Sequence, residues 1–342
     1  MAEIPVIDFA ALDRPELVSA IDRACRTTGF FVIANPPVAP DLVESVYSQA
    51  RAFYDLPAET KERYAIADQP THRGYVPPGE EQYGAVQGAA GDDDALPREV
   101  KEGFEVGLET PADDPDVAAG ALFLGPNPWP AERPEFRAAV SAYYDAMAGL
   151  GETLLRLFAE GLAIEAERFA AMRRRPCSTL RLLKYHAREV DPGETALGIG
   201  VHTDSECFTL LSTRGAGLEA VSRAGRWEAV PEVPGGLVVN IGDTMEVWTN
   251  GAYVSTQHRV VSDGRERYSL PFFVGADFFE VIAPLPELTG PEGPKYEPYV
   301  YGRHIVSEYA KGFRYLRRLA AEGRLELESA PDAVSRFAKA AV

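Results

Sequence analysis

Hydrophobic and polar positions repeat with two different periods along this chain. In residues 14–28 and 132–161, apolar side chains recur every three or four positions, which is the period of an amphipathic α-helix. From residue 178 to 274, apolar residues form short runs rich in β-branched and aromatic side chains, separated by Gly, Pro, Asn and Asp. Helical periodicity returns over residues 304–320. The pattern predicts one β core wrapped by helices.

The β-rich part predicts an antiparallel sandwich or barrel, because its short runs are regularly spaced and two tight-turn pairs, Asn250-Gly251 and Asp263-Gly264, lie among them. The N-terminal part predicts strands at 4–9 and 30–33 and a second helix at 41–54. The expected strands of the core are 180–185, 207–211, 218–221, 227–230, 236–241, 253–261 and 268–274.

Residues 68–130 are rich in Gly, Pro and Asp and predict a long surface excursion with short ordered pieces, such as residues 100–106. No linker-like segment separates the α-rich and β-rich parts. We therefore divide the chain into regions of one unit: an N-terminal α/β region at 1–130, helical support at 131–177, the β core at 178–285 and a helical tail at 286–342.

Charge and composition limit the possible partners. The chain has 342 residues and a formal net charge of -18 at pH 7, so it repels phosphate backbones and we expect no nucleic-acid partner. No apolar run approaches the roughly 20 residues of a membrane span, and the N-terminus lacks a secretory signal pattern. The three cysteines are widely spaced and predict reduced, buried thiols. We expect a cytoplasmic protein without a membrane partner, whose oligomeric state the sequence leaves open.

The candidate chemistry lies in the histidines, of which the chain has only five. His202-Thr203-Asp204 is followed much later by His258, and both lie in the β-rich part. Residues i and i+2 of a strand point to the same face, so His202 and Asp204 can aim at one point that a distant histidine completes. Two imidazoles and one carboxylate suit Fe(II) in non-haem oxygenases, but zinc accepts the same ligands.

Arg267 and Ser269 also share a face of an expected strand. A guanidinium beside a hydroxyl suits a carboxylate, although an exposed arginine paired with Glu266 or Glu228 has the same pattern. The position of Arg267 shortly after His258 favours the anion clamp, because a dicarboxylate bound to the metal needs one at about that distance.

Ordered motifs make the chain resemble the isopenicillin N synthase-like group of Fe(II)- and 2-oxoglutarate-dependent oxygenases. The resemblance extends over nearly the whole chain. Its most specific motifs are Gly200-Val-His-Thr-Asp204, Val239-Asn-Ile-Gly-Asp243, Ser255-Thr-Gln-His-Arg-Val260 and Arg267-Tyr-Ser269, and weaker ones are Ile4-Pro-Val-Ile-Asp-Phe9, His72-Arg-Gly-Tyr75 and Lys101-Glu-Gly-Phe-Glu-Val-Gly107.

The resemblance implies a mainly β fold with flanking α: a double-stranded β-helix, or jelly roll, wrapped by N-terminal, central and C-terminal helices. It implies Fe(II), 2-oxoglutarate as co-substrate, and O₂, with release of succinate and CO₂ during hydroxylation, desaturation or oxidative cyclisation of a small molecule. The implied metal ligands are His202, Asp204 and His258, and the implied 2-oxoglutarate ligands are Arg267, Ser269 and Tyr185.

Three other functions stay open at this point. An iron oxidase of the same fold that does not consume 2-oxoglutarate can keep the Arg and Ser. A non-enzymatic jelly-roll binding module does not need the complete ligand set, and a zinc hydrolase lacks an evident general base. For the substrate, the sequence offers four candidate contact residues: Phe208, Glu206, Trp248 and Phe273.

Overall fold

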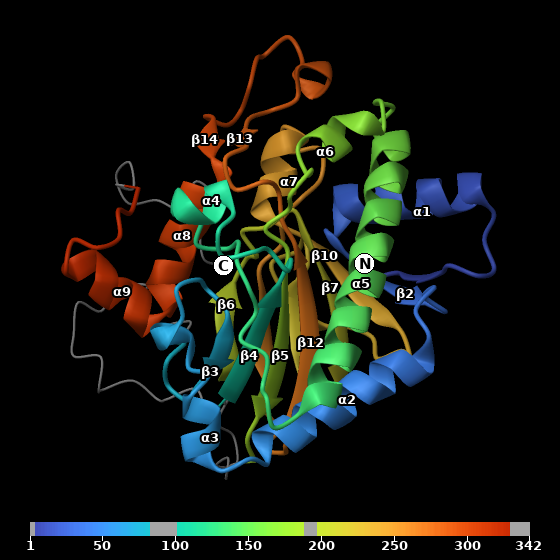
Figure 1. Cartoon of the computed structure of the whole chain (residues 1–342). Helices are drawn as coiled ribbons and strands as arrows, with labels where there is room; N and C mark the ends of the chain where they lie inside the picture. Colours follow the sequence, from blue (N-terminus) through green and yellow to red (C-terminus); the bar gives the residue numbers. More distant parts are fainter. Residues whose placement is uncertain (1–3, 83–100, 188–196, 329–342) are drawn as a thin grey trace.

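The computed structural model of the chain describes residues 4–82, 101–187 and 197–328. Two β-sheets face each other, and helices cover the outside of the larger one (Figure 1). All strand pairs in these two sheets are antiparallel except the parallel pair at the N-terminal edge. This arrangement confirms the expected β core with flanking helices.

The larger sheet brings together strands from both ends of the chain. Its order places strands of the N-terminal region at both edges and four strands of the β core in the middle. The strands, in sheet order, are β1 (Val6–Asp8), β2 (Phe30–Ala34), β10 (Leu237–Ile241), β7 (Phe208–Arg214), β12 (Arg267–Val274), β5 (Thr179–Tyr185), β4 (Lys101–Gly107) and β3 (Gly74–Val76).

The smaller sheet lies against one part of the larger one. Phe30 and Val238 of the larger sheet form a compact apolar cluster with Leu218, Ala220 and Val260 of the smaller. Burial of these side chains between the sheets holds the two layers together. The strands of the smaller sheet, in order, are β6 (Leu197–His202), β11 (His258–Val261), β8 (Leu218–Val221) and β9 (Trp227–Ala229).

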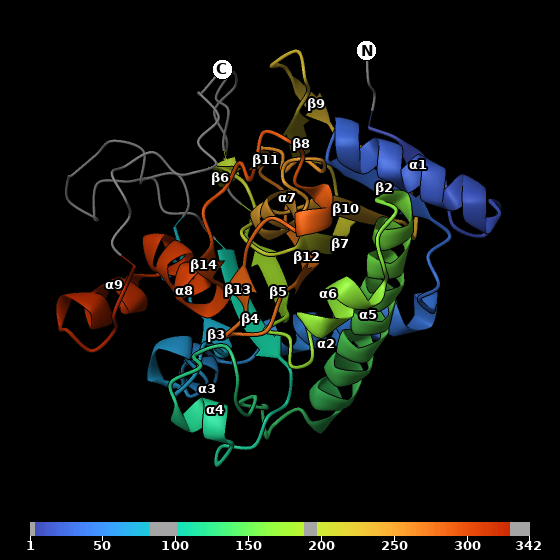
Figure 2. The ribbon, with the colours of Figure 1, turned by 90° about the horizontal axis from the view of Figure 1, so that it is seen from above.

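The helices divide between two sides of the larger sheet. The long helix α5 packs with α1 and α2 on the face that carries Phe208 and Phe272. The C-terminal helices α8 and α9 lie at the edge formed by β3 and β4 (Figure 1 and Figure 2). The helices are α1 (Arg14–Thr27), α2 (Pro40–Tyr54), α3 (Ala58–Glu62), α4 (Pro115–Ala118), α5 (Pro134–Gly161), α6 (Glu167–Ala171), α7 (Asp243–Trp248), α8 (Tyr301–Gly312) and α9 (Arg314–Ala321), with a small hairpin of β13 (Val281–Ile282) and β14 (Tyr299–Val300) before α8.

The expectation of a surface excursion was wrong for part of residues 68–130. Residues 101–107 are not a surface piece: they form β4, every residue of which is buried, and β4 pairs with β5 along its whole length. Polar residues such as Lys101 and Glu105 hid this strand, because their charges are satisfied by buried partners that come from other segments. Residues 83–100, which include part of the predicted excursion, lie outside the described residues.

Two further boundaries differ from expectation. The expected strand at 253–261 is short, because only His258–Val261 pairs with neighbours. Trp248, a candidate substrate contact, lies in the helix α7, all of whose residues are buried. Among the described residues, no helix is both long enough and apolar enough to cross a membrane.

Candidate metal and co-substrate site

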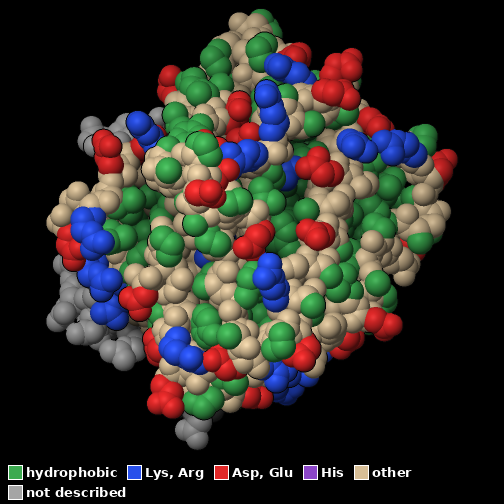
Figure 3. All heavy atoms as spheres, viewed as in Figure 1, with side chains coloured by type: hydrophobic (Ala, Val, Ile, Leu, Met, Phe, Trp, Pro, Cys, Tyr) green, Lys and Arg blue, Asp and Glu red, His purple; other side chains and the backbone are tan. Residues whose placement is uncertain are grey.

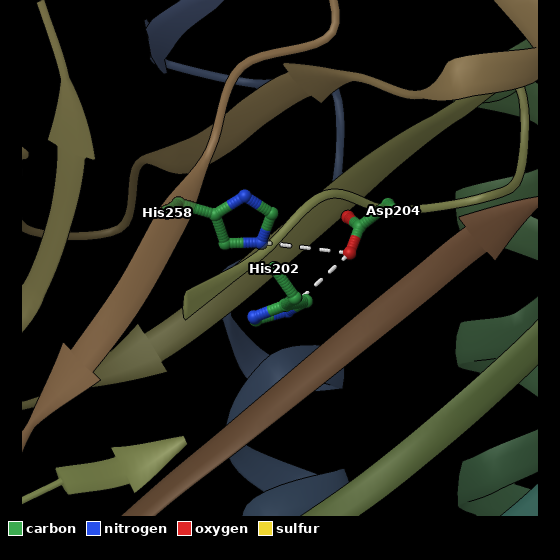
Figure 4. Close-up of side chains that lie close together, drawn as sticks. All are labelled: His202, Asp204 and His258. Carbon is green, nitrogen blue, oxygen red and sulfur yellow. Dashed lines mark ion pairs between the residues drawn. The ribbon is translucent and has the colours of Figure 1, made fainter. Parts of the chain in front are cut away.

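The three predicted metal ligands meet at one point between the two sheets (Figure 4). His202 ends β6 and His258 begins β11, and the two residues are cross-strand partners. Asp204 follows two residues after His202, and its Oδ1 lies 3.6 Å from His202 Nε2 and 3.5 Å from His258 Nε2. One ligand atom from each residue lies within 4.8 Å of the others, which is a spacing that one metal ion can bridge.

Hydrogen bonds orient each ligand of this triad. Nδ1 of His202 lies 2.8 Å from the carbonyl of Gly200, and Nδ1 of His258 lies 3.1 Å from the carbonyl of Thr256. When each Nδ1 carries the proton and donates it to that carbonyl, the two Nε2 atoms are acceptors that face Asp204. The residues therefore fit a divalent metal in both geometry and donor chemistry.

The aspartate is oriented by residues of the larger sheet. Its Oδ2 accepts hydrogen bonds from the hydroxyl of Thr209 on β7 and from the side-chain amide of Asn240 on β10, the latter at 2.6 Å. This leaves Oδ1 directed toward the imidazoles. Sequence reasoning missed both of these residues, although Asn240 lies inside the Val239–Asp243 motif and Thr209 shares a face with Phe273 by strand register.

Burial and mutual charge set the protonation of the triad. Burial, together with the nearby His258, lowers the pKa of His202 to about 4. Burial acts to raise the pKa of Asp204, but the His258 imidazole and the Thr209 hydroxyl outweigh it and hold that pKa below its usual value. Burial acts to lower the pKa of His258, yet the Asp204 carboxylate raises it overall. Near neutral pH the site thus offers a carboxylate and a neutral His202, while His258 is the ligand that must lose a proton.

The loop that carries Asp204 is fixed by α7. The backbone amide of Asp243 donates to the carbonyl of Asp204 at 2.7 Å, and the Thr203 hydroxyl donates to Asp243 Oδ2 at 3.0 Å. The Thr244 hydroxyl donates to the carbonyl of Ser205 at 2.7 Å. These bonds explain why the Asn-Ile-Gly-Asp motif accompanies the ligand motif: it supplies the helix start that holds the ligand loop.

The predicted anion clamp also assembles. Arg267 and Tyr185 are cross-strand partners on β12 and β5, and the guanidinium lies 5.0 Å from the centre of the tyrosine ring. Arg267 Nη2 donates to Thr213 Oγ1 at 2.5 Å, and Nε donates to the carbonyl of Gly215 at 3.3 Å. Its Nη1 is buried and has no hydrogen-bond partner among the described residues. A buried cationic donor without a partner is costly unless a ligand accepts from it.

Ser269 lies two residues further along β12 and on the same face as Arg267. Both side chains therefore point into the space between the sheets, where a carboxylate can accept from the guanidinium and the hydroxyl together. The orphaned Nη1 and this shared face show that the residues present fit a dicarboxylate co-substrate.

The four candidate substrate residues separate into two groups. Phe208 packs edge-on against Phe158 of α5, and Trp248 packs against Phe169 of α6, so both lie in the core on the helix side. Phe273 lies on the inner face and is only partly buried, and Glu206 is buried in the ligand loop. Alternation along β7 separates Phe208 from the inner residue Thr209.

Family models and curated relatives that match this chain are non-haem, 2-oxoglutarate-dependent oxygenases. The model of a non-haem dioxygenase N-terminal region matches residues 4–132, and that of the 2OG-Fe(II) oxygenase superfamily matches residues 176–276. The chain is 32% identical to the 2-oxoglutarate-Fe(II) type oxidoreductase hxnY of Emericella nidulans, over 97% of this chain and 98% of that protein. It is 30% identical to homoarginine-6-hydroxylase of Arabidopsis thaliana, over 91% of this chain and 97% of that one.

Solved structures share the fold. A full-length Neurospora crassa protein in complex with alpha-KG and thymine superposes with a TM-score of 0.75 at 29% identity, covering 93% of this chain and 97% of that one. A 2OG-Fe(II) oxygenase family protein from Caulobacter crescentus superposes with a TM-score of 0.74 at 30% identity, covering 94% of this chain and 99% of that one.

Proposed function

Because this chain belongs to the family of 2-oxoglutarate- and Fe(II)-dependent oxygenases, we propose that His202, Asp204 and His258 hold its iron. The protein is an enzyme that oxidises a small molecule with Fe(II), 2-oxoglutarate and O₂. The observation that carries the residue assignment is the convergence of Oδ1 and two Nε2 atoms on one point. Family membership supports this function over the two other hypotheses, a zinc hydrolase and a non-enzymatic binding module.

For the co-substrate, the proposed ligands are Arg267, Ser269 and Tyr185. The buried Nη1 of Arg267, which lacks a partner among the described residues, supports a bound carboxylate at this position. The Tyr185 ring lies beside the guanidinium of Arg267 and restricts the directions in which its N–H groups can point. The same observation favours the 2-oxoglutarate-dependent reaction over an oxidase that does not consume the co-substrate.

The chemistry divides between the bound groups and the protein. When bound, iron and 2-oxoglutarate supply O₂ activation and oxidation of the substrate, with succinate and CO₂ as by-products. The protein would contribute the three ligands of the triad, the carboxylate clamp on the strand two places from that of Asn240, and a mostly buried inner face that limits water. Hydroxylation, desaturation and oxidative cyclisation are all compatible with this arrangement.

The test of this proposal is spectroscopic and stoichiometric. Anaerobic addition of Fe(II) and 2-oxoglutarate to the protein is expected to give a visible charge-transfer band, which Asp204→Ala loses. With a substrate, one succinate is expected per oxidised product. Substrate oxidation without succinate would replace the proposal by the 2-oxoglutarate-independent oxidase.

Further proposals concern partners and organisation. We infer a cytoplasmic enzyme that binds neither nucleic acid nor membrane, which the net charge of -18 and the three buried free cysteines support. Acidic and basic side chains are interspersed over most of the face drawn in Figure 3. We also keep the regions 1–130, 131–177, 178–285 and 286–342 as parts of one unit, supported by the N-terminal strands that join the larger sheet.

A further inference from the structure

A charged side chain lies beside the proposed iron site on the inner face of the larger sheet. Strand register places Phe273 of β12 next to Thr209, which hydrogen-bonds Asp204, and β5 is the following strand. Arg181 of β5 is buried, and its guanidinium lies 5.3 Å from the centre of the Phe273 ring. Arg181 thus lies on the same face of the larger sheet as Thr209, two strands away from it.

Two buried carboxylates fix this guanidinium from the edge of the sheet. Arg181 Nη1 lies 2.6 Å from Glu81, and Nε lies 2.5 Å from Glu105 on β4. All three residues are at most 4% exposed. A long side chain held at two nitrogens loses its conformational freedom on folding, so a ligand that contacts it does not bear that entropy cost.

Tyr309 of α8 connects Arg181 to the metal-ligand loop. Its hydroxyl donates to Glu206 Oε1 at 2.8 Å, and Arg181 lies 5.7 Å from the centre of its ring. Glu206 is buried two residues after Asp204. A carboxylate acceptor and a guanidinium donor therefore flank one tyrosine, and the carboxylate belongs to the loop that carries Asp204.

We propose that Glu206 and Arg181 form the polar part of the substrate site, and that the substrate presents an amide-type group: an N–H for Glu206 beside a carbonyl for Arg181. The inference rests on the proposed function and narrows its substrate class. A carboxylate offers about four acceptor positions, so Glu206 can accept from a ligand as well as from Tyr309, and the positive charge of Arg181 favours a carbonyl oxygen near it.

The opposite class of substrate, a purely apolar molecule, fits this surface poorly. It would exclude water from the remaining acceptor positions of Glu206 without supplying a donor to them, which is unfavourable. A site built to hydrogen-bond a substrate rejects analogues that lack the group much more strongly than an apolar pocket rejects an extra methyl. The proposal thus predicts discrimination at the nitrogen of the amide.

The first experiment measures that discrimination without relying on turnover. Ligand-observed NMR with the Zn(II)- and 2-oxoglutarate-loaded protein compares three amides, 4-methylbenzamide, δ-valerolactam and thymine, with their fully N-methylated forms and with p-xylene. At least one amide is expected to bind about tenfold or more tightly than its N-methylated form, and p-xylene is expected not to compete. The bound amide is then tested for oxidation with Fe(II).

Variants assign the discrimination to named groups. In Glu206→Met, the ratio of affinities between the amide and its N-methylated form is expected to fall to about one, and Glu206→Gln is expected to restore part of it. Tyr309→Phe is expected to reduce the ratio severalfold, because Glu206 loses the donor that positions it. The matched control is Tyr315→Phe, which also removes a buried hydroxyl, here one 2.6 Å from His72 Nδ1, and is expected to leave the ratio within twofold.

Clear outcomes overturn the proposal. Equal binding of amides and N-methylated forms, binding of p-xylene alone, or binding of none of the three amides would reject an amide-type substrate. An unchanged ratio in Glu206→Met would reject the role of Glu206. Failure of the proposed function looks different, because the protein would then show no charge-transfer band with Fe(II) and 2-oxoglutarate.

Discussion

The iron triad lies between the two sheets, and the charged cluster around Arg181 lies on the inner face of the larger sheet. The two are built in different ways. The triad uses two cross-strand histidines and one residue two positions along the chain, and short backbone contacts orient it. The cluster collects Glu81, Glu105, Arg181 and Tyr309 from four separate segments. Pairing of two strands and a short loop therefore bring the triad together, whereas the packing of distant segments brings the cluster together.

This difference explains what each region can do. A metal site needs ligands fixed in one geometry, and residues on paired strands provide it directly. A substrate site must differ between relatives that share one reaction, and contacts between separate segments can change without disturbing the strands. The comparison predicts total loss of activity from changes in the first region and graded effects from changes in the second.

The largest expected effect comes from His258→Ala. Without this imidazole the site loses one of three ligands, so iron binding and succinate formation are expected to fall to background, measured by metal analysis and by product assay. The control is His304→Ala on α8, where the ring packs against Tyr299, and it is expected to keep its iron. Full activity in the His258 variant would reject the metal assignment.

Loss of the anion clamp is expected to weaken co-substrate binding rather than abolish chemistry. Arg267→Leu removes a charge-assisted hydrogen bond of about 1.5–3 kcal/mol, which corresponds to a rise of roughly 10- to 100-fold in KM for 2-oxoglutarate. Arg214→Leu on the neighbouring β7, an arginine paired with Glu44, is the matched control and is expected to leave that KM unchanged. An unchanged KM in Arg267→Leu would remove the clamp from the proposal.

Iron affinity is expected to depend on pH through His258. The Asp204 carboxylate raises the pKa of His258 above its usual value of about 6.5, so this histidine must lose a proton before it can bind metal. Anaerobic titration is expected to show roughly tenfold weaker Fe(II) binding at pH 6 than at pH 8, and His202, with a pKa of about 4, is neutral at both values. Affinity that does not change with pH would contradict this protonation scheme.

The smallest effect concerns stability in the charged cluster. Burial raises the pKa of Glu105 to about 7, so the folded state favours its protonated form and its contribution to stability is lost as pH rises from about 4.5 through 7. Between pH 5 and pH 8, metal-free wild type is expected to lose roughly 2–3 kcal/mol of unfolding free energy relative to Glu105→Gln, measured by urea denaturation. The exposed Glu59→Gln serves as control, and parallel curves for wild type and Glu105→Gln would show that Glu105 titrates normally.

Sequence reasoning recovered most strands of the core and the long helix at 134–161, because these segments have clear periods and strong turn signals. It placed β4 in a surface excursion instead of the main sheet, and it did not predict helix α7, which carries the candidate substrate residue Trp248. The polar residues of β4 are typical of a surface segment, and they are buried only because distant segments cover them. The apolar residues of α7 could face a cavity or the core, and the packing of other helices decides which.

The candidate substrate residues show the same limit. Strand alternation separates Phe208 from the inner Thr209, but which face is the inner one depends on where α5 packs. Phe273 lies on the inner face by strand register, whereas Glu206 lies in the loop after β6, so strand alternation does not apply to it. Contact of either residue with the substrate stays a prediction. Arg181 was missed, although its period-two relation to Tyr185 on β5 was a usable signal.

The sequence alone therefore determined the family and the reaction class and predicted the ligand set and the clamp, because these depend on motifs in a fixed order or on residues close together in the chain. Only the tertiary structure decided what surrounds them. Glu81, Glu105, Arg181 and Tyr309 meet because β4 pairs with β5 and α8 docks at that edge. Contacts between segments separated by tens to hundreds of residues depend on strand register and helix docking, which no local pattern encodes.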